Sequence, residues 1–217
     1  MAGARKNVRQ EAPQGRARAR VHNRDREAEI LLTARTVFEE RGFDAASVAE
    51  IARRSRVAEG TIYLYSATKR ELLQKVVARW YEGLIAEIEQ GLAERDGAEA
   101  KLRYFAARHF RLHAEDAAIG RLTVRELRSA PDYPASSLHE LNRRYTRLFT
   151  AIIRAGLASG EIRPGVRPDV ARDMFFGALE HLGMGGTGGA RRADGALSFF
   201  GLFWRAIASG KPTSDNE

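Results

Sequence analysis

The sequence contains no cysteine, which excludes disulfide bonds, thiol catalysis and cysteine-containing zinc fingers and favours a cytoplasmic protein. Its apolar runs are only a few residues long, far short of the roughly 20 residues that a membrane span needs. No apolar run follows the arginine-rich amino terminus, so we expect no secretory signal and no contact with a membrane. Aromatic residues make up only 8% of the chain, which argues against a single-strand-binding surface of stacked rings.

Apolar residues (44%) and charged residues (29%) are both abundant enough for a soluble, folded chain with a core. The net charge of +8 is unevenly distributed, because residues 1–27 carry eight Lys or Arg and only three acidic residues. Such a segment is either an arm that meets a polyanion or a solvated tail that binds nothing. We predict that residues 1–23 are a disordered basic arm, since they show no apolar periodicity, and that residues 211–217 are a disordered tail.

From residue 25 onward, apolar residues recur at intervals of three and four, which predicts nine helices and no strand. The chain is therefore expected to be all-α. The glycine-rich stretch 183–189 is predicted to be a loop, and without a preceding strand it is not a dinucleotide site. Capping boxes, in which a side chain accepts a hydrogen bond from the amide three residues later, mark several helix starts. They are Ser47 to Glu50, Thr68 to Glu71, Asp96 to Glu99 and Ser137 to Glu140.

Residues 47–65 are predicted to form two short helices joined by a tight turn, the pattern of a helix-turn-helix. The second helix of such a unit lies in the major groove of DNA, where hydroxyls reach phosphates or bases and a leucine can meet a thymine methyl. Lys69, at the start of the next helix, is suited to a phosphate. The alternative is an ordinary helical corner with a solvated basic rim. The candidate contacts on the second helix are Thr61, Tyr63, Leu64 and Tyr65.

Five submotifs between Arg26 and Leu73 occur at the spacing of one known family. They are Ile30-Leu31-Leu32-Thr33-Ala34, Val37-Phe38-Glu39-Glu40-Arg41-Gly42-Phe43, Val48-Ala49-Glu50-Ile51-Ala52, Val57-Ala58-Glu59-Gly60-Thr61-Ile62-Tyr63-Leu64-Tyr65 and Lys69-Arg70-Glu71-Leu72-Leu73. This region resembles the TetR family of bacterial transcription regulators. The resemblance implies a homodimer of nine-helix subunits, with a helix-turn-helix DNA-binding domain at 24–70 and a helical ligand-binding and dimerisation domain at 71–210.

The resemblance also implies functional residues. The family's DNA contacts fall on Ser47, Thr61, Tyr63 and Tyr65, and Lys69 corresponds to its phosphate-contacting lysine. One position departs from the pattern, because Ser66 stands where the family usually has phenylalanine. The missing aromatic anchor predicts looser packing of the recognition helix on the fourth helix.

The carboxyl-terminal half resembles the branch of that family that regulates fatty-acid degradation and answers to long-chain acyl-CoA. The resemblance rests on Glu126-Leu127-Arg128 and on residues 152–156, 160–163 and 171–179. Three arginines at i, i+4 and i+7 suit a pyrophosphate or carboxylate, and apolar residues could line a channel for an acyl chain. The alternative is a solvated arginine face above an ordinary core. The candidate ligand residues are Phe105, His109, Arg121, Arg125, Arg128, Tyr145, Phe149 and Phe176.

The eighth and ninth helices are the candidates for the dimer interface, through a four-helix contact between subunits. The alternative is that their apolar residues are buried within one subunit. The residues assigned to this interface are Met174, Phe175, Leu179, Leu197, Phe200 and Trp204.

Signals for other classes of function are weak. His109 and His113 have the i, i+4 spacing of a metal chelate, but no third ligand stands out, so no metal is expected. There is no nucleophile elbow or other catalytic constellation, which predicts neither an enzyme nor a cofactor. The sequence therefore predicts a homodimeric repressor that binds a pseudo-palindromic DNA operator and is released by a small-molecule effector. The alternative is a helical small-molecule-binding protein with weak or lost DNA binding.

Overall fold

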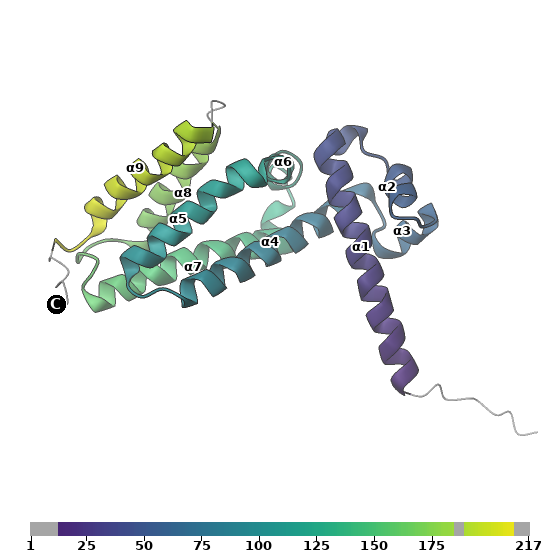
Figure 1. Cartoon of the computed structure of the whole chain (residues 1–217), viewed down its shortest axis with the longest axis horizontal. Coiled ribbons are helices and arrows are strands. Elements are labelled where there is room, and N and C mark those ends of the chain that lie inside the picture. Colours follow the sequence, from purple (N-terminus) through teal and green to yellow (C-terminus); the bar gives the residue numbers. More distant parts are fainter. Residues whose placement is uncertain (1–12, 185–188, 211–217) are drawn as a thin grey trace, which may run out of the picture. The chain divides into compact units, whose positions relative to one another are not determined.

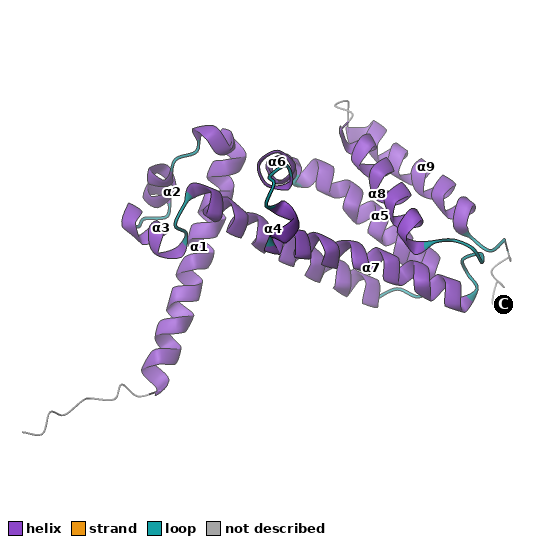
Figure 2. Cartoon of the chain, turned by 180° about the vertical axis from the view of Figure 1, so that it is seen from behind, coloured by secondary structure: helices purple, strands orange, loops and turns teal. Residues whose placement is uncertain are grey.

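The structure, a computed structural model, describes residues 13–184 and 189–210 of the chain (Figure 2). Within these ranges it contains nine α-helices, one π-helix and one short 3₁₀ turn, and its only strand-like pairing is an isolated bridge between Ile162 and Ala208. The prediction of an all-α, nine-helix chain is confirmed. No helix in the described ranges has both the length and the apolar composition that crossing a bilayer requires.

The chain divides into two compact units, and the division falls after Val76, inside the fourth helix (Figure 1). The first unit consists of three helices and the start of α4. Its core is formed by aliphatic and aromatic side chains that are fully buried, among them Ile30, Phe38, Ile51 and Ile62. The helices of this unit are α1 (Pro13–Ala45), α2 (Val48–Arg54), α3 (Glu59–Tyr65) and the beginning of α4 (Lys69–Ala93).

In the second unit, α5 packs against α7, α8 and α9, and α7 also packs against α8. Phenylalanines from these helices fill the core, and Phe105, Phe149, Phe175 and Phe200 are all buried. Besides the rest of α4, the unit contains α5 (Ala98–Glu115), α6 (Ala117–Leu122), a π-helix (Thr123–Arg128), a 3₁₀ turn (Tyr133–Ala135), α7 (Ser137–Ser159), α8 (Pro168–Met184) and α9 (Gly189–Ile207).

The first helix begins earlier than the sequence predicts. The lack of apolar periodicity predicts disorder through residue 23, but α1 is helical from Pro13, so the prediction is wrong for residues 13–23. Alanine and arginine, which alternate from Arg16 to Arg20, are among the strongest helix formers, and proline is well accommodated in the first turn. Residues 1–12 and 211–217 lie outside the described residues. The predicted end of the helix is confirmed, because Gly42 has a positive φ of 75° and interrupts the helical backbone.

Two of the four predicted helix caps are confirmed. Ser47 accepts a hydrogen bond from the amide of Glu50 at 3.1 Å, and Thr68 accepts one from the amide of Glu71 at 3.0 Å. The cap of α7 lies one residue before the predicted one, because Ser136 rather than Ser137 accepts from the amide of His139.

The predicted cap of α5 at Asp96 is wrong. Gly97 is the capping position and has a φ of 75°, and the first helical amide, that of Ala98, donates to the carboxylate of Glu161 at 2.7 Å. The acceptor comes from a residue 63 positions away, beyond α7, so local spacing could not reveal it.

Two helix boundaries also differ from the sequence prediction. The glycine-rich stretch 183–189 is helical at both ends, since α8 continues through Met184 and α9 begins at Gly189, while 185–188 lie outside the described residues. The packing of α8 and α9 against each other and against α5 compensates for the low helix propensity of glycine. The single helix expected from 117 to 129 is instead α6 followed by the π-helix 123–128.

Candidate nucleic-acid interface and effector core

The helix-turn-helix predicted at 47–65 is present in the first unit, and backbone hydrogen bonds fix its turn. The amide of Val57 donates to the carbonyl of Ala52 at 3.0 Å, and Arg56 adopts a left-handed conformation with a φ of 56°. Ile51 of α2 and Ile62 of α3 are both buried, so each helix turns one side to the core. The opposite side of α3 is thereby presented to solvent.

The exposed side of α3 carries two large side chains that do not contribute to the core. Tyr63 is 48% exposed and Leu64 is 83% exposed. Thr61 and Tyr65, the other two predicted contacts on this helix, are half-buried. An almost fully exposed leucine next to a tyrosine is an apolar and hydroxyl-bearing surface of the kind that reads base edges.

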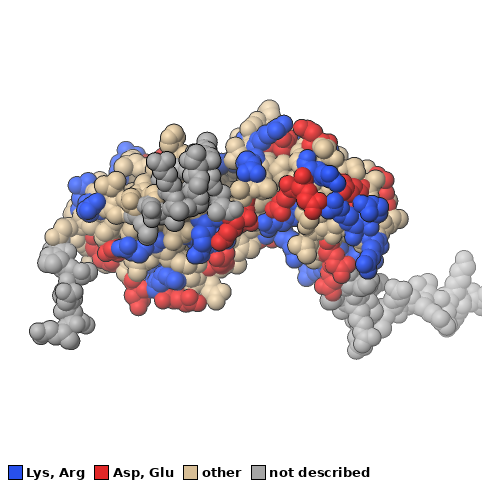
Figure 3. All heavy atoms as spheres, turned by 45° about the horizontal axis from the view of Figure 1, so that its top comes forward, with Lys and Arg blue, Asp and Glu red and all other residues tan. Residues whose placement is uncertain are grey.

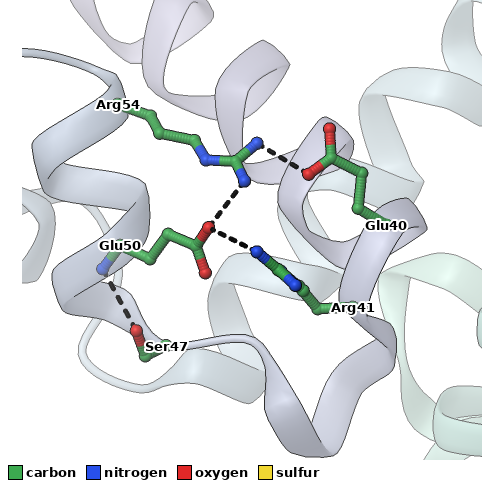
Figure 4. A network of polar contacts seen from close by, with 5 residues as sticks. All are labelled: Glu40, Arg41, Ser47, Glu50 and Arg54. Carbon is green, nitrogen blue, oxygen red and sulfur yellow. Dashed lines mark hydrogen bonds and ion pairs between the residues drawn. The ribbon is translucent and has the colours of Figure 1, made fainter.

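A network of charged side chains joins α2 to the end of α1 (Figure 4). The guanidinium of Arg54 donates to Glu40 at 2.7 Å and to Glu50 at 2.6 Å, and Arg41 lies 3.7 Å from the Glu50 carboxylate. The hydrogen bond from Arg54 is the main cause that holds the pKa of Glu50 below its usual value. Sequence reasoning missed this network, because the carboxylate that matches Arg54 across the helices lies 14 residues away.

Ser47 lies at the edge of this network and is exposed. Its Oγ accepts the capping hydrogen bond from the Glu50 amide, so the hydroxyl proton is still free to be donated. The predicted phosphate contact by Ser47 is compatible with this arrangement.

The ammonium group of Lys69, the predicted phosphate contact, is directed to backbone carbonyls in this structure. Its Nζ donates to the carbonyls of Phe43 at 2.8 Å, Asp44 at 3.2 Å and Ala46 at 3.0 Å, and it lies 4.6 Å from the centre of the Phe43 ring. A lysine has three N–H donors, and all three are used here. Lys69 therefore holds the segment that precedes Ser47 against the start of α4.

The end of α3 is fixed to both α1 and α4. The hydroxyl of Tyr65 donates to the side-chain oxygen of Asn23, and the ammonium of Lys75 donates to the backbone carbonyl of Tyr65 and, at 3.3 Å, to Glu27. Ser66, which follows Tyr65, is only 2% exposed, and its Oγ has no hydrogen-bond partner among the described residues. The serine thus occupies a buried position without satisfying its own hydroxyl.

In the second unit, five of the eight predicted ligand residues form one aromatic cluster. Phe105 lies in ring contact with Tyr145, Phe149 and Phe176 at centroid distances of 5.2, 5.9 and 5.9 Å. The ring of His109 lies 5.1 Å from that of Phe176, and its Nδ1 is 2.7 Å from the Tyr145 hydroxyl. Burial raises the pKa of Tyr145 well above its usual value.

The three predicted arginines differ in exposure and in partners. Arg121 and Arg125 are exposed, and Arg125 lies 3.1 Å from Glu126. Arg128 is half-buried and donates to Glu180, which is also half-buried, at 3.3 Å. Arg125 and Arg128 lie in the π-helix, whose wider turns differ from the regular helical spacing on which the prediction of one arginine face rests.

A polar edge around Arg128 was not predicted from the sequence. Tyr81 is buried there and donates to the side-chain oxygen of Asn142 at 3.2 Å. Burial raises the pKa of Tyr81 to about 12, against an opposing effect of the Arg128 charge. Burial also raises the pKa of Tyr133.

Comparison with known proteins identifies the family to which this chain belongs. Residues 30–76 match the family model described as bacterial regulatory proteins of the tetR family, and residues 95–183 match that of the tetracyclin repressor-like C-terminal domain. The fatty acid metabolism regulator protein of Bacillus subtilis (strain 168) is 31% identical over 152 residues, which cover 70% of this chain and 78% of that protein. The chain belongs to the TetR family. It is a transcription regulator, and α2 and α3 form its DNA-binding helix-turn-helix.

Solved structures of TetR regulators share the fold of this TetR chain. The transcriptional regulator FadR from Bacillus subtilis, solved in complex with stearoyl-CoA, has a TM-score of 0.70 at 28% identity and covers 85% of this chain and 98% of its own. The ketosteroid regulator KstR2 of Mycobacterium tuberculosis has a TM-score of 0.61 at 18% identity, covering 84% of this chain and 95% of its own, which shows the fold alone. These relatives are regulators rather than enzymes.

Three of the residues assigned to the dimer interface lie inside the core of this TetR subunit. Phe175, Leu179 and Phe200 are at most 2% exposed, so they pack within one subunit, as the alternative held. Met174 is 56% exposed and Trp204 is half-buried, while the side chain of Leu197 lies outside the described residues. Sequence reasoning missed two other exposed apolar residues on the same helices, Val170 (44%) and Leu202 (63%).

The structure describes the side chain of only one of the two histidines considered for metal binding. His109 belongs to the aromatic cluster, and the side chain of His113 lies outside the described residues. Within the described part of the chain, no three His, Asp or Glu side chains are placed to hold a metal ion.

Proposed function

We propose that this TetR regulator is a homodimeric repressor that binds a pseudo-palindromic operator and is released from it by a long-chain acyl-CoA. The observation that carries the DNA-binding part is the outer face of α3, where Tyr63 and Leu64 are exposed on the side opposite the buried Ile62. Tyr63 and Leu64 add little to the core of this unit, so they are available to a partner. Double-stranded DNA is the partner that a helix-turn-helix presents them to.

The residues of the first unit have two kinds of role in this proposal. Thr61, Tyr63 and Leu64 reach base edges in the major groove, and Ser47 donates to a phosphate that sets the register. Tyr65 and Lys69 act through the protein instead, because their donors already bind Asn23 and the carbonyls before α2. They position the reading helix rather than contact the operator themselves.

Two observations support an acyl-CoA effector. The chain is 31% identical to a fatty acid metabolism regulator, and its 28% identical structural relative was solved with stearoyl-CoA. The aromatic cluster around Phe105, Phe149 and Phe176 is an apolar region suited to an acyl chain, and the Tyr145 hydroxyl and His109 add polar groups within it. Arg128 offers a half-buried guanidinium for an anionic group of the ligand.

Release from DNA follows if the ligand binds two conformers unequally. The rings of Phe105, Phe149 and Phe176 pack directly on one another, so an acyl chain among them favours a conformer in which they have moved apart. α4 contributes residues to both units, so a change in its position transmits ligand binding in the second unit to the DNA-binding unit. A tenfold loss of DNA affinity requires about 1.4 kcal/mol of differential ligand binding.

The proposed dimer interface uses the exposed apolar residues of α8 and α9. Val170 and Met174 are one helical turn apart on α8, and Leu202 is exposed on α9. A two-fold dimer formed through these helices places two α3 helices on half-sites that lie about one turn of DNA apart, or a multiple of it.

The DNA-binding part is tested by selecting duplexes from a random pool with the full chain and measuring affinity for the enriched sequence. We expect a two-fold symmetric consensus, and we expect Leu64→Ala to weaken binding by about tenfold, or about 1.4 kcal/mol. Leu32→Ala is the matched control, because Leu32 is a 66% exposed leucine on α1. Equal effects of the two variants, or no enriched sequence, would contradict the proposal.

A further inference from the structure

α3, the helix that carries Tyr63 and Leu64, depends on its neighbours for its position. It is seven residues long, and among its residues, all of which the structure describes, Ile62 is the one that is buried. A helix this short is not stable by itself in water, so contacts with other helices hold it. One buried side chain fixes the place of α3 on the core but not its tilt. The contacts at the ends of α3 therefore set the direction in which its outer face points.

Two charged side chains of α4 bind the backbone where α3 ends. The ammonium of Lys75 donates to the carbonyl of Tyr65, the last residue of α3. The carboxylate of Glu71 accepts a hydrogen bond from the amide of Ala67 at 2.8 Å. Glu71 and Lys75 are four residues apart, so they lie on the same face of α4. We name these two side chains the α4 pair.

The α4 pair acts on the main chain at the end of α3 rather than on its side chains. The carbonyl of the last residue of a helix has no partner within the helix, and a cation is favourable at that end. Lys75 is also 3.3 Å from Glu27 of α1, and Tyr65 donates through its hydroxyl to Asn23, so α1 supports the same end. The direction of α3 therefore follows the position of the α4 pair.

Ser66 lies between the two backbone contacts of the α4 pair. It is the C-cap residue of α3 and is only 2% exposed. Its small side chain offers little apolar contact at this buried position, and its Oγ has no hydrogen-bond partner among the described residues. The end of α3 is thus held by charged side chains on either side of the serine, and not by a large apolar side chain at position 66.

The charge of the surrounding unit is nearly balanced. Residues 28–76 contain eight basic and seven acidic residues. Figure 3 accordingly shows Lys and Arg intermingled with Asp and Glu over the described part of this unit. Attraction to phosphates draws a protein to any DNA sequence, whereas contacts with base edges distinguish sequences. Discrimination between sequences therefore depends on how accurately α3 is directed into the groove.

From these observations we propose that the α4 pair sets the angle of α3 in the major groove and thereby the discrimination between base sequences by Tyr63 and Leu64. The inference rests on the proposed reading of base edges by α3 and deepens it. Lys75 and Glu71 are positioning residues, because they act on DNA through the backbone at the end of α3. Their charges are opposite, but their effects on the direction of α3 are the same.

The opposite charges of the α4 pair provide the test. The quantity is the ratio of the affinity for the selected operator to the affinity for a scrambled duplex of the same length and composition. Lys75→Met removes a positive charge and Glu71→Ala removes a negative one, so charge alone changes the affinity for both duplexes in opposite directions. We expect both variants to lower the ratio by about tenfold, a loss of the size that one mismatched base pair causes.

Two control variants separate the hydrogen bond of Lys75 from its charge. Lys75→Arg keeps a cationic donor near the carbonyl of Tyr65 and is expected to keep most of the wild-type ratio. Arg79→Met removes the same charge as Lys75→Met from an exposed position one turn further along α4, and its ratio is expected to equal that of the wild type.

A loss of stability alone does not reproduce the expected result. It reduces the fraction of folded protein, which lowers both apparent affinities by the same factor and leaves their ratio unchanged; far-UV circular dichroism melts measure this fraction. An unchanged ratio in Lys75→Met or in Glu71→Ala would overturn the inference. A salt slope that falls by about 0.9 for each Lys75→Met subunit would overturn it too, because Lys75 would then contact a phosphate. A wild-type protein that does not distinguish the two duplexes would instead refute the proposed function itself.

Discussion

Replacing Lys69 by methionine distinguishes a structural role of this residue from a direct contact with DNA. Methionine preserves most of the apolar stem and removes the ammonium group. In the structure that group donates to three backbone carbonyls, those of Phe43, Asp44 and Ala46. The variant leaves these carbonyls without their donors and releases the segment that leads into α2.

The magnitude follows from the exposure of the three hydrogen bonds. The bonds to Phe43 and Ala46 are partly buried, and each is worth about 1 kcal/mol, while the exposed bond to Asp44 can be replaced by water. The position of Nζ above the Phe43 ring adds about 0.5 kcal/mol. We therefore expect Lys69→Met to lower the free energy of unfolding by about 1–3 kcal/mol.

Urea denaturation followed by far-UV circular dichroism measures the stability, and operator binding at several salt concentrations measures the role in DNA recognition. Lys69→Met is expected to be destabilised and to bind DNA more weakly, with an unchanged salt slope, because its charge does not reach a phosphate. Arg70→Met, which removes the same charge from the neighbouring position, serves as the control for stability. Unchanged stability, together with a salt slope reduced by about 0.9 for each Lys69 of the proposed dimer, would refute the structural role. It would support a direct contact between Lys69 and a phosphate instead.

Three other predictions concern single side chains. The pKa of Glu50 is lowered from 4.5, mainly by the hydrogen bond from Arg54, so the stabilisation by ionised Glu50 is present above pH 4.5 and is lost as the pH falls through the lower pKa of the folded state. Glu50→Gln should lose this part of the acid dependence of stability in melts at several pH values. An unaltered pH profile of stability would contradict this prediction. Ser66→Ala is expected to raise the free energy of unfolding by up to about 1 kcal/mol in urea titrations, because it removes a buried hydroxyl without a partner among the described residues; destabilisation would count against this explanation. Leu202→Glu should convert the proposed dimer to a monomer in sedimentation experiments, and a dimer of undiminished affinity would exclude the exposed face of α9 from the interface.

Local sequence signals predicted the parts of the fold that depend on neighbouring residues. The caps at Ser47 and Thr68, the end of the first helix at Gly42 and the amphipathic periods of α2 and α3 all involve residues within one helical turn. These signals were sufficient to locate the helix-turn-helix, because the buried Ile51 and Ile62 leave only one face of α3 for DNA.

Features that depend on distant partners could not be predicted in this way. The cap of α5 comes from Glu161, and the donors of Lys69 are directed to carbonyls more than twenty residues away. The predicted arginine face assumed regular helical turns from residue 121 to 128, where the structure has α6 followed by a π-helix, and Arg128 is the half-buried arginine of the three. The prediction of disorder for residues 13–23 depended on their lack of apolar periodicity. Their alanine and arginine content nevertheless suffices for a helix.

Release of operator DNA by stearoyl-CoA tests the central claim most directly. Fluorescence anisotropy of the full chain on its selected operator would be measured with stearoyl-CoA and, as a control, with coenzyme A lacking the acyl chain. We predict at least a roughly tenfold loss of DNA affinity with stearoyl-CoA and none with coenzyme A alone. Tight operator binding that stearoyl-CoA leaves unchanged would contradict the proposed effector.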